Sequence, residues 1–322
     1  MVQARNIEFD ILKGILIVLV VVGHALRSCF SAPTDYHPLF IFIYTFHMPL
    51  FIFVSGYFFS SCLKYDFKTL IEKKTKRLII PLLLYSTILL GLFLASSSPK
   101  TLGRIYEVYV TYWYLICVYA LTIAYYLYKV GGVFLKYTLA LLLVTMIVFY
   151  NYTPPHILQD CQIIRQAIIF GIGIWFRENQ ERLANMKQGS KIAVIGCTLI
   201  LAVAGIVIDR CTWGFNIFDF PSQIRILDGI LCSVVAFIVL MPLIRLDTDN
   251  LIGKTFSYLG RYSLCVYLVH MLFFKFIRYN SYELPESLWL AAALSVVWLL
   301  LSVLAIGLLK RLKLSKPYFV GL

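Results

Sequence analysis

Long apolar stretches recur along the whole chain, and they restrict the fold more than any other feature of the sequence. Each is close to the roughly 20 residues that an α-helix needs to cross the hydrocarbon core of a bilayer. The chain is 61% hydrophobic and only 14% charged, with a mean hydropathy of +0.83. A soluble domain cannot bury that much apolar surface, so the sequence predicts an all-α polytopic membrane protein. The ten predicted spans cover residues 11–29, 38–60, 78–95, 105–128, 133–151, 161–176, 191–208, 223–244, 255–278 and 287–309.

The distribution of positive charge predicts how these spans are oriented. Most lysines and arginines between the spans fall in alternate connections, whereas the other connections hold only Lys100, Arg104 and Arg210. Because cytoplasmic loops are enriched in Lys and Arg, this bias favours cytoplasmic termini and an even number of spans. The net charge of +13 follows this pattern, so we expect membrane lipids and not nucleic acid as partners. We expect one integral domain, residues 1–322, in the cytoplasmic (inner) membrane.

Neither the cysteines nor the spacing of the spans suggests a metal site or a transporter repeat. The eight cysteines are scattered, most of them within apolar stretches, and none forms a CxxC or Cys/His ligand pattern. The connections are short, and no internal repeat of the inverted-repeat transporter type is visible. We therefore expect no metal and no permanently bound cofactor.

Two ionisable residues, Lys13 and His24, lie in the first apolar stretch. A charged group near the bilayer centre costs about 2.5 kcal/mol or more, so an intramembrane polar site is the default interpretation. Eleven residues are about three helical turns, which puts both side chains on one face, roughly 16 Å apart along the axis. His24 can act as a general base near neutral pH, or it can simply bridge two helices. Lys13 can serve the site, reach the interface, or pair with Asp10 one turn earlier.

His47 lies in a second apolar stretch, two residues before Pro49. Proline removes a backbone donor and frees a carbonyl in the middle of a membrane helix, and such breaks often border a cavity. The neighbouring Gly56 is better explained by close helix packing.

A third histidine, His270, belongs to a polar stripe in a late apolar stretch. Ser263, Tyr267 and His270 are spaced i, i+4 and i+7, so one helical face carries all three. Arg225 and Asp228 are one turn apart near the outer end of the eighth predicted span, where they form either a local salt bridge or part of a site.

The third predicted span begins with a basic run that contains Lys73, Lys74, Lys76 and Arg77. Such a run usually marks topology and contacts anionic lipids. It can also dock a phosphorylated cytoplasmic ligand, and the sequence leaves both interpretations open.

Lys13 and the three histidines fall into three segments, which are residues 6–14 with Gly23 and His24, residues 46–57, and residues 262–270. In this order and over most of the chain, the segments resemble the acyltransferase type 3 family of membrane O-acyltransferases. The similarity is greatest to its fucose 4-O-acetylase-like branch. Lys76 and Arg77 before Pro81, and residues 113–115, fit the family more loosely.

The resemblance implies a ten-helix O-acetyltransferase. It would move an acyl group from cytoplasmic acyl-CoA, usually acetyl-CoA as co-substrate, to a hydroxyl of an envelope glycan, glycolipid or lipid-linked sugar. Many members carry arginine where this chain has Lys13, which keeps the charge but lacks the planar guanidinium. The residues implied are catalytic His24, His47 and His270, acyl-CoA-binding Lys13, Lys76 and Arg77, and acceptor-binding or polarising Ser263, Tyr267, Arg165, Arg225 and Asp228.

Two alternatives stay open at this point. The acyl group can pass directly to the acceptor, with His24 as general base, or through a covalent acyl-histidine. The competing class is a transporter or flippase of an envelope precursor, because buried His and Arg residues also serve proton relays and substrate paths. Only an acyltransferase releases free CoA from acetyl-CoA.

Overall fold

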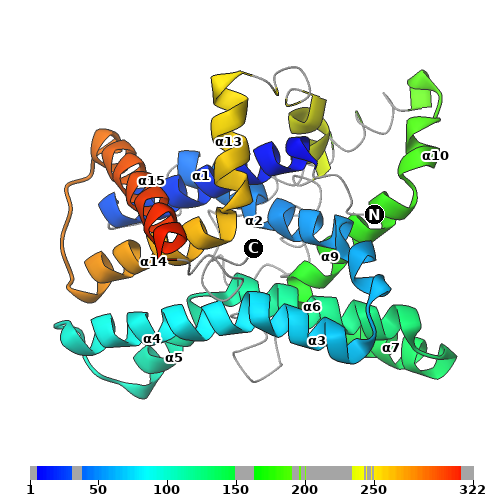
Figure 1. Cartoon of the computed structure of the whole chain (residues 1–322), viewed down its shortest axis with the longest axis horizontal. Coiled ribbons are helices and arrows are strands. Elements are labelled where there is room, and N and C mark those ends of the chain that lie inside the picture. Colours follow the sequence, from blue (N-terminus) through cyan, green and yellow to red (C-terminus); the bar gives the residue numbers. More distant parts are fainter. Residues whose placement is uncertain are drawn as a thin grey trace. The chain divides into compact units, whose positions relative to one another are not determined.

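The computed structural model is helical throughout the part of the chain that it describes (Figure 1). No strand occurs among those residues, which confirms the all-α prediction. Five helices are long and apolar enough to cross a membrane, and a bent pair makes a sixth if it counts as one span. The chain is therefore a membrane protein, while ten spans and cytoplasmic termini stay predictions. The described residues are 6–30, 38–148, 163–190, 234–242 and 250–312, with the single positions 196, 200, 244 and 248.

The chain divides into two compact units, each assembled from separate parts of the sequence. Unit 1 comprises residues 1–44, 68–119 and 243–322, and unit 2 comprises residues 45–67 and 120–242. Within unit 1, segments from both ends of the chain pack together. Our expectation of one domain over residues 1–322 stays a prediction.

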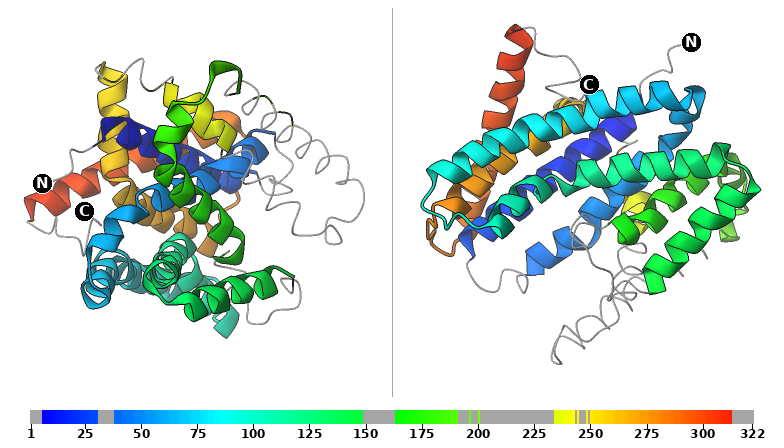
Figure 2. Two further views of the ribbon diagram at one scale, coloured as in Figure 1. Left: turned by 90° about the vertical axis from the view of Figure 1, so that its right-hand side faces the viewer. Right: turned by 90° about the horizontal axis from the view of Figure 1, so that it is seen from below.

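Helix α1 (Ile7–Cys29) runs through unit 1 and is buried on most of its surface. Asn6 begins it, because its side-chain oxygen accepts a hydrogen bond from the Phe9 N–H at 3.3 Å. Helix α1 packs against α13 (Leu251–Arg261), α14 (Ser263–Tyr279) and α15 (Leu288–Arg311). The blue α1 and the orange α14 lie side by side in Figures 1 and 2.

Two glycines bring α1 and α13 into backbone contact. A Cβ atom on Gly14 would overlap the carbonyl group of Phe256, and one on Gly260 would overlap the carbonyl group of Asp10. Small residues at such crossings allow membrane helices to approach closely. This crossing fixes the first half of α1 within unit 1.

The structure breaks two helices that we expected to be continuous. Helices α13 and α14 are bent by 76° at Tyr262, within the predicted span 255–278. The predicted span 105–128 is divided into α5 (Leu102–Val110) and α6 (Trp113–Val130). At this second break, the Thr111 hydroxyl donates to the Glu107 carbonyl oxygen at 2.7 Å, a side-chain bond of a kind that competes with regular helix geometry.

The third span is longer than predicted and contains a π-helical turn. Helix α3 (Phe67–Lys74) continues through Thr75–Ile79 into α4 (Ile80–Ala95), and together they form one candidate span. Proline at position 81 has no N–H for the carbonyl of Arg77, which explains why the regular hydrogen-bond pattern changes here.

Unit 2 is built around the second half of α2 (Pro38–Tyr57) and α9 (Ile163–Glu178). A Cβ atom on Gly56 would overlap the Phe170 carbonyl, and one on Gly173 would overlap the Phe53 carbonyl. This contact confirms the packing role predicted for Gly56. The unit also holds the short helix at Phe59–Lys64, α7 (Val133–Val148) and α10 (Gln180–Ala184). The predicted span 191–208 and most of 223–244 lie outside the described residues.

Candidate active site

Two of the predicted histidines meet inside unit 1. His24 on α1 and His270 on α14 have ring centroids 5.3 Å apart, although 246 positions separate them in the sequence. The ring of Phe274 lies 4.6 Å from the His24 ring, and the ring of Tyr44 lies edge-on to it at 6.4 Å. The packing of α14 against α1 therefore produces a histidine pair with an aromatic wall.

His270 is fully buried, and its hydrogen bonding defines the chemistry of its ring. Nδ1 lies 2.7 Å from the carbonyl oxygen of Val266, and a carbonyl can only accept, so Nδ1 carries a proton and donates. In the neutral ring, Nε2 then holds a lone pair. Within the described part of the chain, Nε2 has no hydrogen-bond partner, which is uncommon for a buried polar atom. This nitrogen is suited to accept a hydrogen bond from a ligand hydroxyl.

A group of tyrosines adjoins the histidine pair. The ring of Tyr267 lies 6.0 Å from His270, 5.9 Å from Tyr112 and 5.8 Å from Tyr114. The Tyr112 hydroxyl donates to the Leu268 carbonyl oxygen at 3.1 Å, which ties the break between α5 and α6 to α14. Sequence reasoning selected Tyr267 but missed Tyr112, because nothing in its local pattern shows this contact between distant segments.

Ser263, the third member of the predicted stripe, is the first residue of α14 and is half-buried. Ser263, Tyr267 and His270 therefore lie on one continuous helix, as their spacing predicts. The catalytic and acceptor-binding roles expected for them stay predictions.

Lys13 forms an ion pair with Asp10 on the same helix, with Nζ 2.7 Å from the carboxylate oxygen. Asp10 is only 3% exposed, so the pair is mostly withdrawn from solvent. This confirms the alternative in which Lys13 pairs one turn earlier. Because α1 is continuous, the pair and His24 are carried by one helix.

The structure describes only some of the other predicted site residues. His47 is buried in unit 2, at 2% exposure, on the helix that contains Pro49. Lys76 pairs with Glu72, and Arg77 is exposed within the π-helical turn. Arg165 is on α9, but its side chain is not among those described, and positions 225 and 228 (Arg225 and Asp228) lie outside the described residues.

The described residues contain no group of three or more His, Cys, Asp or Glu side chains that could hold a metal ion. They include four free cysteines, all buried, at positions 29, 62, 117 and 265.

Comparison with known proteins identifies the class. The model of a family described as an acyltransferase domain matches residues 6–308, a range that includes Lys13 and both histidines of the pair. The chain therefore belongs to the acyltransferase type 3 family, as the sequence segments predicted.

Two curated relatives share this similarity. The nodulation protein NolL of Sinorhizobium fredii is 30% identical over 224 residues, which are 66% of this chain and 60% of the relative. The nodulation protein NolL of Mesorhizobium japonicum is 36% identical over 121 residues, which are 34% of this chain and 32% of that relative. Each alignment thus covers less than two thirds of the relative's length. No solved structure matches the chain significantly.

Proposed function

We propose that this acyltransferase is an O-acetyltransferase of the cytoplasmic membrane. It would take an acyl group from cytoplasmic acyl-CoA, most often acetyl-CoA, and deliver it to a hydroxyl of an envelope glycan, glycolipid or lipid-linked sugar. The observation that carries the proposal is the contact between the His24 and His270 rings within an acyltransferase domain.

In the proposed reaction, His24 is the general base. It removes the proton from the acceptor hydroxyl while the hydroxyl oxygen attacks the carbonyl carbon of the thioester. The tetrahedral intermediate then collapses, the carbon–sulfur bond breaks, and the CoA thiolate leaves. The imidazolium of His24 returns its proton to the thiolate, so the enzyme ends in its starting state.

The hydrogen bonding of His270 favours a positioning role. Its Nδ1–H is engaged by the Val266 carbonyl, so neutral His270 has no N–H left for an oxyanion. Its Nε2 can instead accept a hydrogen bond, either from the acceptor hydroxyl or from the His24 ring 5.3 Å away. We therefore assign His270 to orienting the acceptor or the base, and not to polarising the carbonyl.

The remaining expected roles complete the proposal. Lys76 and Arg77 would hold the CoA phosphates at the cytoplasmic side, and the pantetheine arm would pass the pair of Lys13 and Asp10. Of the other residues expected from the family, His47, Tyr267 and Ser263 would help to position the reactants, and Arg165, Arg225 and Asp228 would bind the sugar.

The test is release of free CoA from acetyl-CoA by the purified protein in lipid nanodiscs, with a panel of glycan acceptors. Wild-type protein should release CoA only when an acceptor is present. Loss of a general base lowers turnover by about 10²–10⁴-fold, so His24→Ala should abolish measurable transfer. His270→Gln should retain part of it, because only positioning is lost.

Thermal unfolding of each variant checks that the fold is intact. Turnover at the wild-type rate in folded His24→Ala would refute the assignment of the base. Absence of CoA release with every acceptor, together with no binding of acetyl-CoA, would favour a transporter.

A further inference from the structure

Five charged side chains of α1, α5 and α14 form a network of electrostatic interactions in unit 1. Lys275 and Arg278 of α14 interact electrostatically with each other, with Arg27 of α1, and with Arg104 and Glu107 of α5. We call these five residues the cationic cluster. It contains four positive groups and a single carboxylate, and none of them was selected as a site residue from the sequence.

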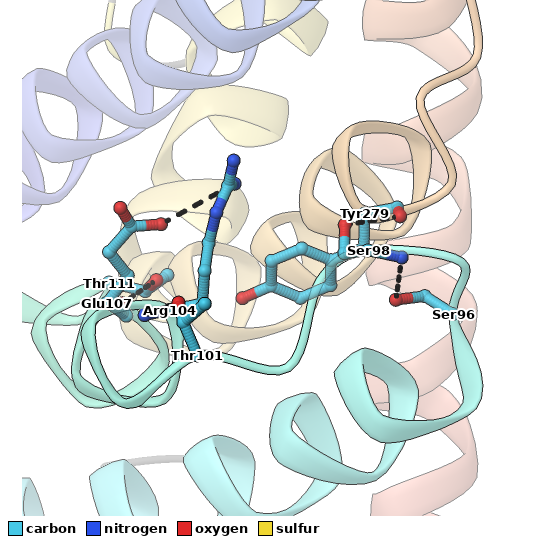
Figure 3. Close-up of polar contacts among 7 residues, drawn as sticks. All are labelled: Ser96, Ser98, Thr101, Arg104, Glu107, Thr111 and Tyr279. Atoms are coloured by element: carbon cyan, nitrogen blue, oxygen red, sulfur yellow. Dashed lines mark hydrogen bonds and ion pairs between the residues drawn. The ribbon is translucent and has the colours of Figure 1, made fainter.

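The carboxylate neutralises only part of this charge. The closest approach of Arg104 to Glu107 is 3.8 Å, which is an ion pair but too long for a hydrogen bond, and both side chains are about half exposed (Figure 3). The remaining like charges, which include Lys275, Arg278 and Arg27, repel one another. Binding of an anion would relieve this repulsion, so the arrangement favours one.

A buried tyrosine hydroxyl points to the same place. Tyr279 is 2% exposed, and among the described residues its hydroxyl has no hydrogen-bond partner. In Figure 3 the hydroxyl end of the ring faces Arg104, and Tyr279 also interacts electrostatically with Arg104 and Glu107. The Ser98 hydroxyl donates to the Tyr279 carbonyl at 2.7 Å and fixes its backbone. A buried donor without an acceptor, beside several cations, suits an anionic oxygen.

The cationic cluster adjoins the histidine pair through one shared ring. Phe274 lies 4.6 Å from the His24 ring, and the guanidinium carbon of Arg278 lies 6.0 Å from the centroid of Phe274. Arg27 follows His24 by three residues, one turn along α1. An anion held by the cluster would therefore lie beside any hydroxyl presented to His24.

We propose that the cationic cluster binds an oxyanion carried by the acceptor, which makes the acceptor an acidic glycan or glycolipid with a carboxylate, phosphate or sulfate group. This inference rests on the proposed O-acetyltransferase function. The predicted topology puts the cluster near the outer ends of its helices, away from the cytoplasmic entry of acyl-CoA. Guanidinium groups bind carboxylate and phosphate with two parallel hydrogen bonds, which suits recognition of such a group.

The first experiment measures binding of radiolabelled inorganic pyrophosphate to the protein in phosphatidylcholine nanodiscs. Arg27→Gln with Arg278→Gln should weaken binding at least about tenfold, because two charges are removed. Glu107→Gln should strengthen binding several-fold, because the competing carboxylate is lost. Arg311→Gln, an exposed arginine at the end of α15, is the matched control and should bind as wild type does.

Weaker pyrophosphate binding in the double variant together with stronger binding in Glu107→Gln cannot arise from partial unfolding, because unfolding would weaken binding in both. Absence of wild-type binding, or equal binding in the double variant and wild type, would overturn the anion site. The same measurement with phosphatidylglycerol in the nanodiscs separates the two sources of an oxyanion. If the anionic lipid displaces pyrophosphate from the wild-type cluster, the site holds a headgroup and the acceptor assignment is wrong.

The second arm compares acetyl transfer to methyl glucoside and methyl glucuronide, which differ in one carboxylate. Wild-type protein should have the lower KM for the glucuronide, and the double variant should lose this preference, so that the two sugars have similar KM values. Turnover without a preference would overturn the acidic acceptor. If neither sugar nor any other acceptor is turned over, the proposed function fails, while pyrophosphate binding still decides whether the anion site exists.

Discussion

Replacing Gly260 by alanine should disturb the crossing that holds α1 in place. The added Cβ would meet two backbone groups of α1 at once, overlapping the Asp10 carbonyl and lying 2.8 Å from the Gly14 nitrogen. A flexible side chain can rotate away from such a contact, but backbone atoms cannot. The two helices therefore have to separate, and α1 carries Lys13 and His24 with it.

The expected loss of stability follows from this geometry. Ordinary Cβ contacts begin at 3.4 Å, so the Gly14 nitrogen alone requires a shift of about 0.6 Å, and the carbonyl requires more. Overpacking of this kind typically costs about 1–3 kcal/mol. Each kcal/mol corresponds to roughly 2–4 °C in Tm for a domain of 150–250 residues. We expect the Tm of Gly260→Ala to fall by several degrees, with a parallel loss of acyl transfer.

The buried cysteines of this protein supply the assay. A thiol-reactive fluorescent dye added during heating reports unfolding as the cysteines become accessible. Gly307→Ala is the matched control, because a Cβ on Gly307 of α15 meets no atom within 4 Å. Alanine is about 1 kcal/mol better than glycine as a helix former, so this variant should unfold at the same temperature or higher. The described cysteines that serve as reporters are Cys29, Cys62, Cys117 and Cys265.

Equal Tm values for Gly260→Ala and Gly307→Ala would refute the reasoning, because the crossing would then tolerate a methyl group. A second comparison uses the facing glycine. Gly14→Ala should destabilise in the same way, and the double variant should lose less than the sum of the single losses, because the first substitution already separates the helices. Full additivity would mean that the two glycines do not share one contact.

Three further substitutions test the interactions around the site, with the same dye assay and with CoA release. Asp10→Asn should destabilise by about 1–3 kcal/mol, less than a fully buried pair, because the Lys13 side chain is 28% exposed. An unchanged Tm in Asp10→Asn would show that the ion pair contributes nothing to stability. Lys13→Arg should keep both the ion pair and most of the activity. Tyr112→Phe removes the donor to the Leu268 carbonyl and should cost about 1 kcal/mol.

The helices were predictable where hydropathy alone decides them. The first span was expected at 11–29 and is found at Ile7–Cys29, and the last was expected at 287–309 and is found at Leu288–Arg311. The breaks at Tyr262 and after Val110 were not predictable, because neither is marked by a proline or by a long polar connection. At the second break, one hydrogen bond joins Tyr112 to Leu268, which is 156 residues away, and no local pattern encodes such a contact.

The sequence allowed single residues of the candidate site to be selected, but it did not show which of them lie in contact. Lys13, His24 and His270 could be selected because an ionisable group in an apolar stretch is costly and needs a reason. The pairing of Lys13 with Asp10 was available locally, from a spacing of three residues. The approach of His24 to His270 depends on how α14 packs against α1, which only the folded chain defines.

The charged residues near the two ends of α1 differ in their net charge. Near the N-terminal end, Lys13 is matched by the nearly buried Asp10, so this ion pair adds no net charge beside the proposed path of the thioester arm. Past His24, Arg27 interacts electrostatically with Lys275 and Arg278 of α14, so this end carries excess positive charge among the described residues. An anionic acceptor would be attracted to the second end and not to the first. If the donor enters from the cytoplasm, the two substrates approach His24 from opposite ends of one helix, and neither has to displace the other for the proton transfer to occur.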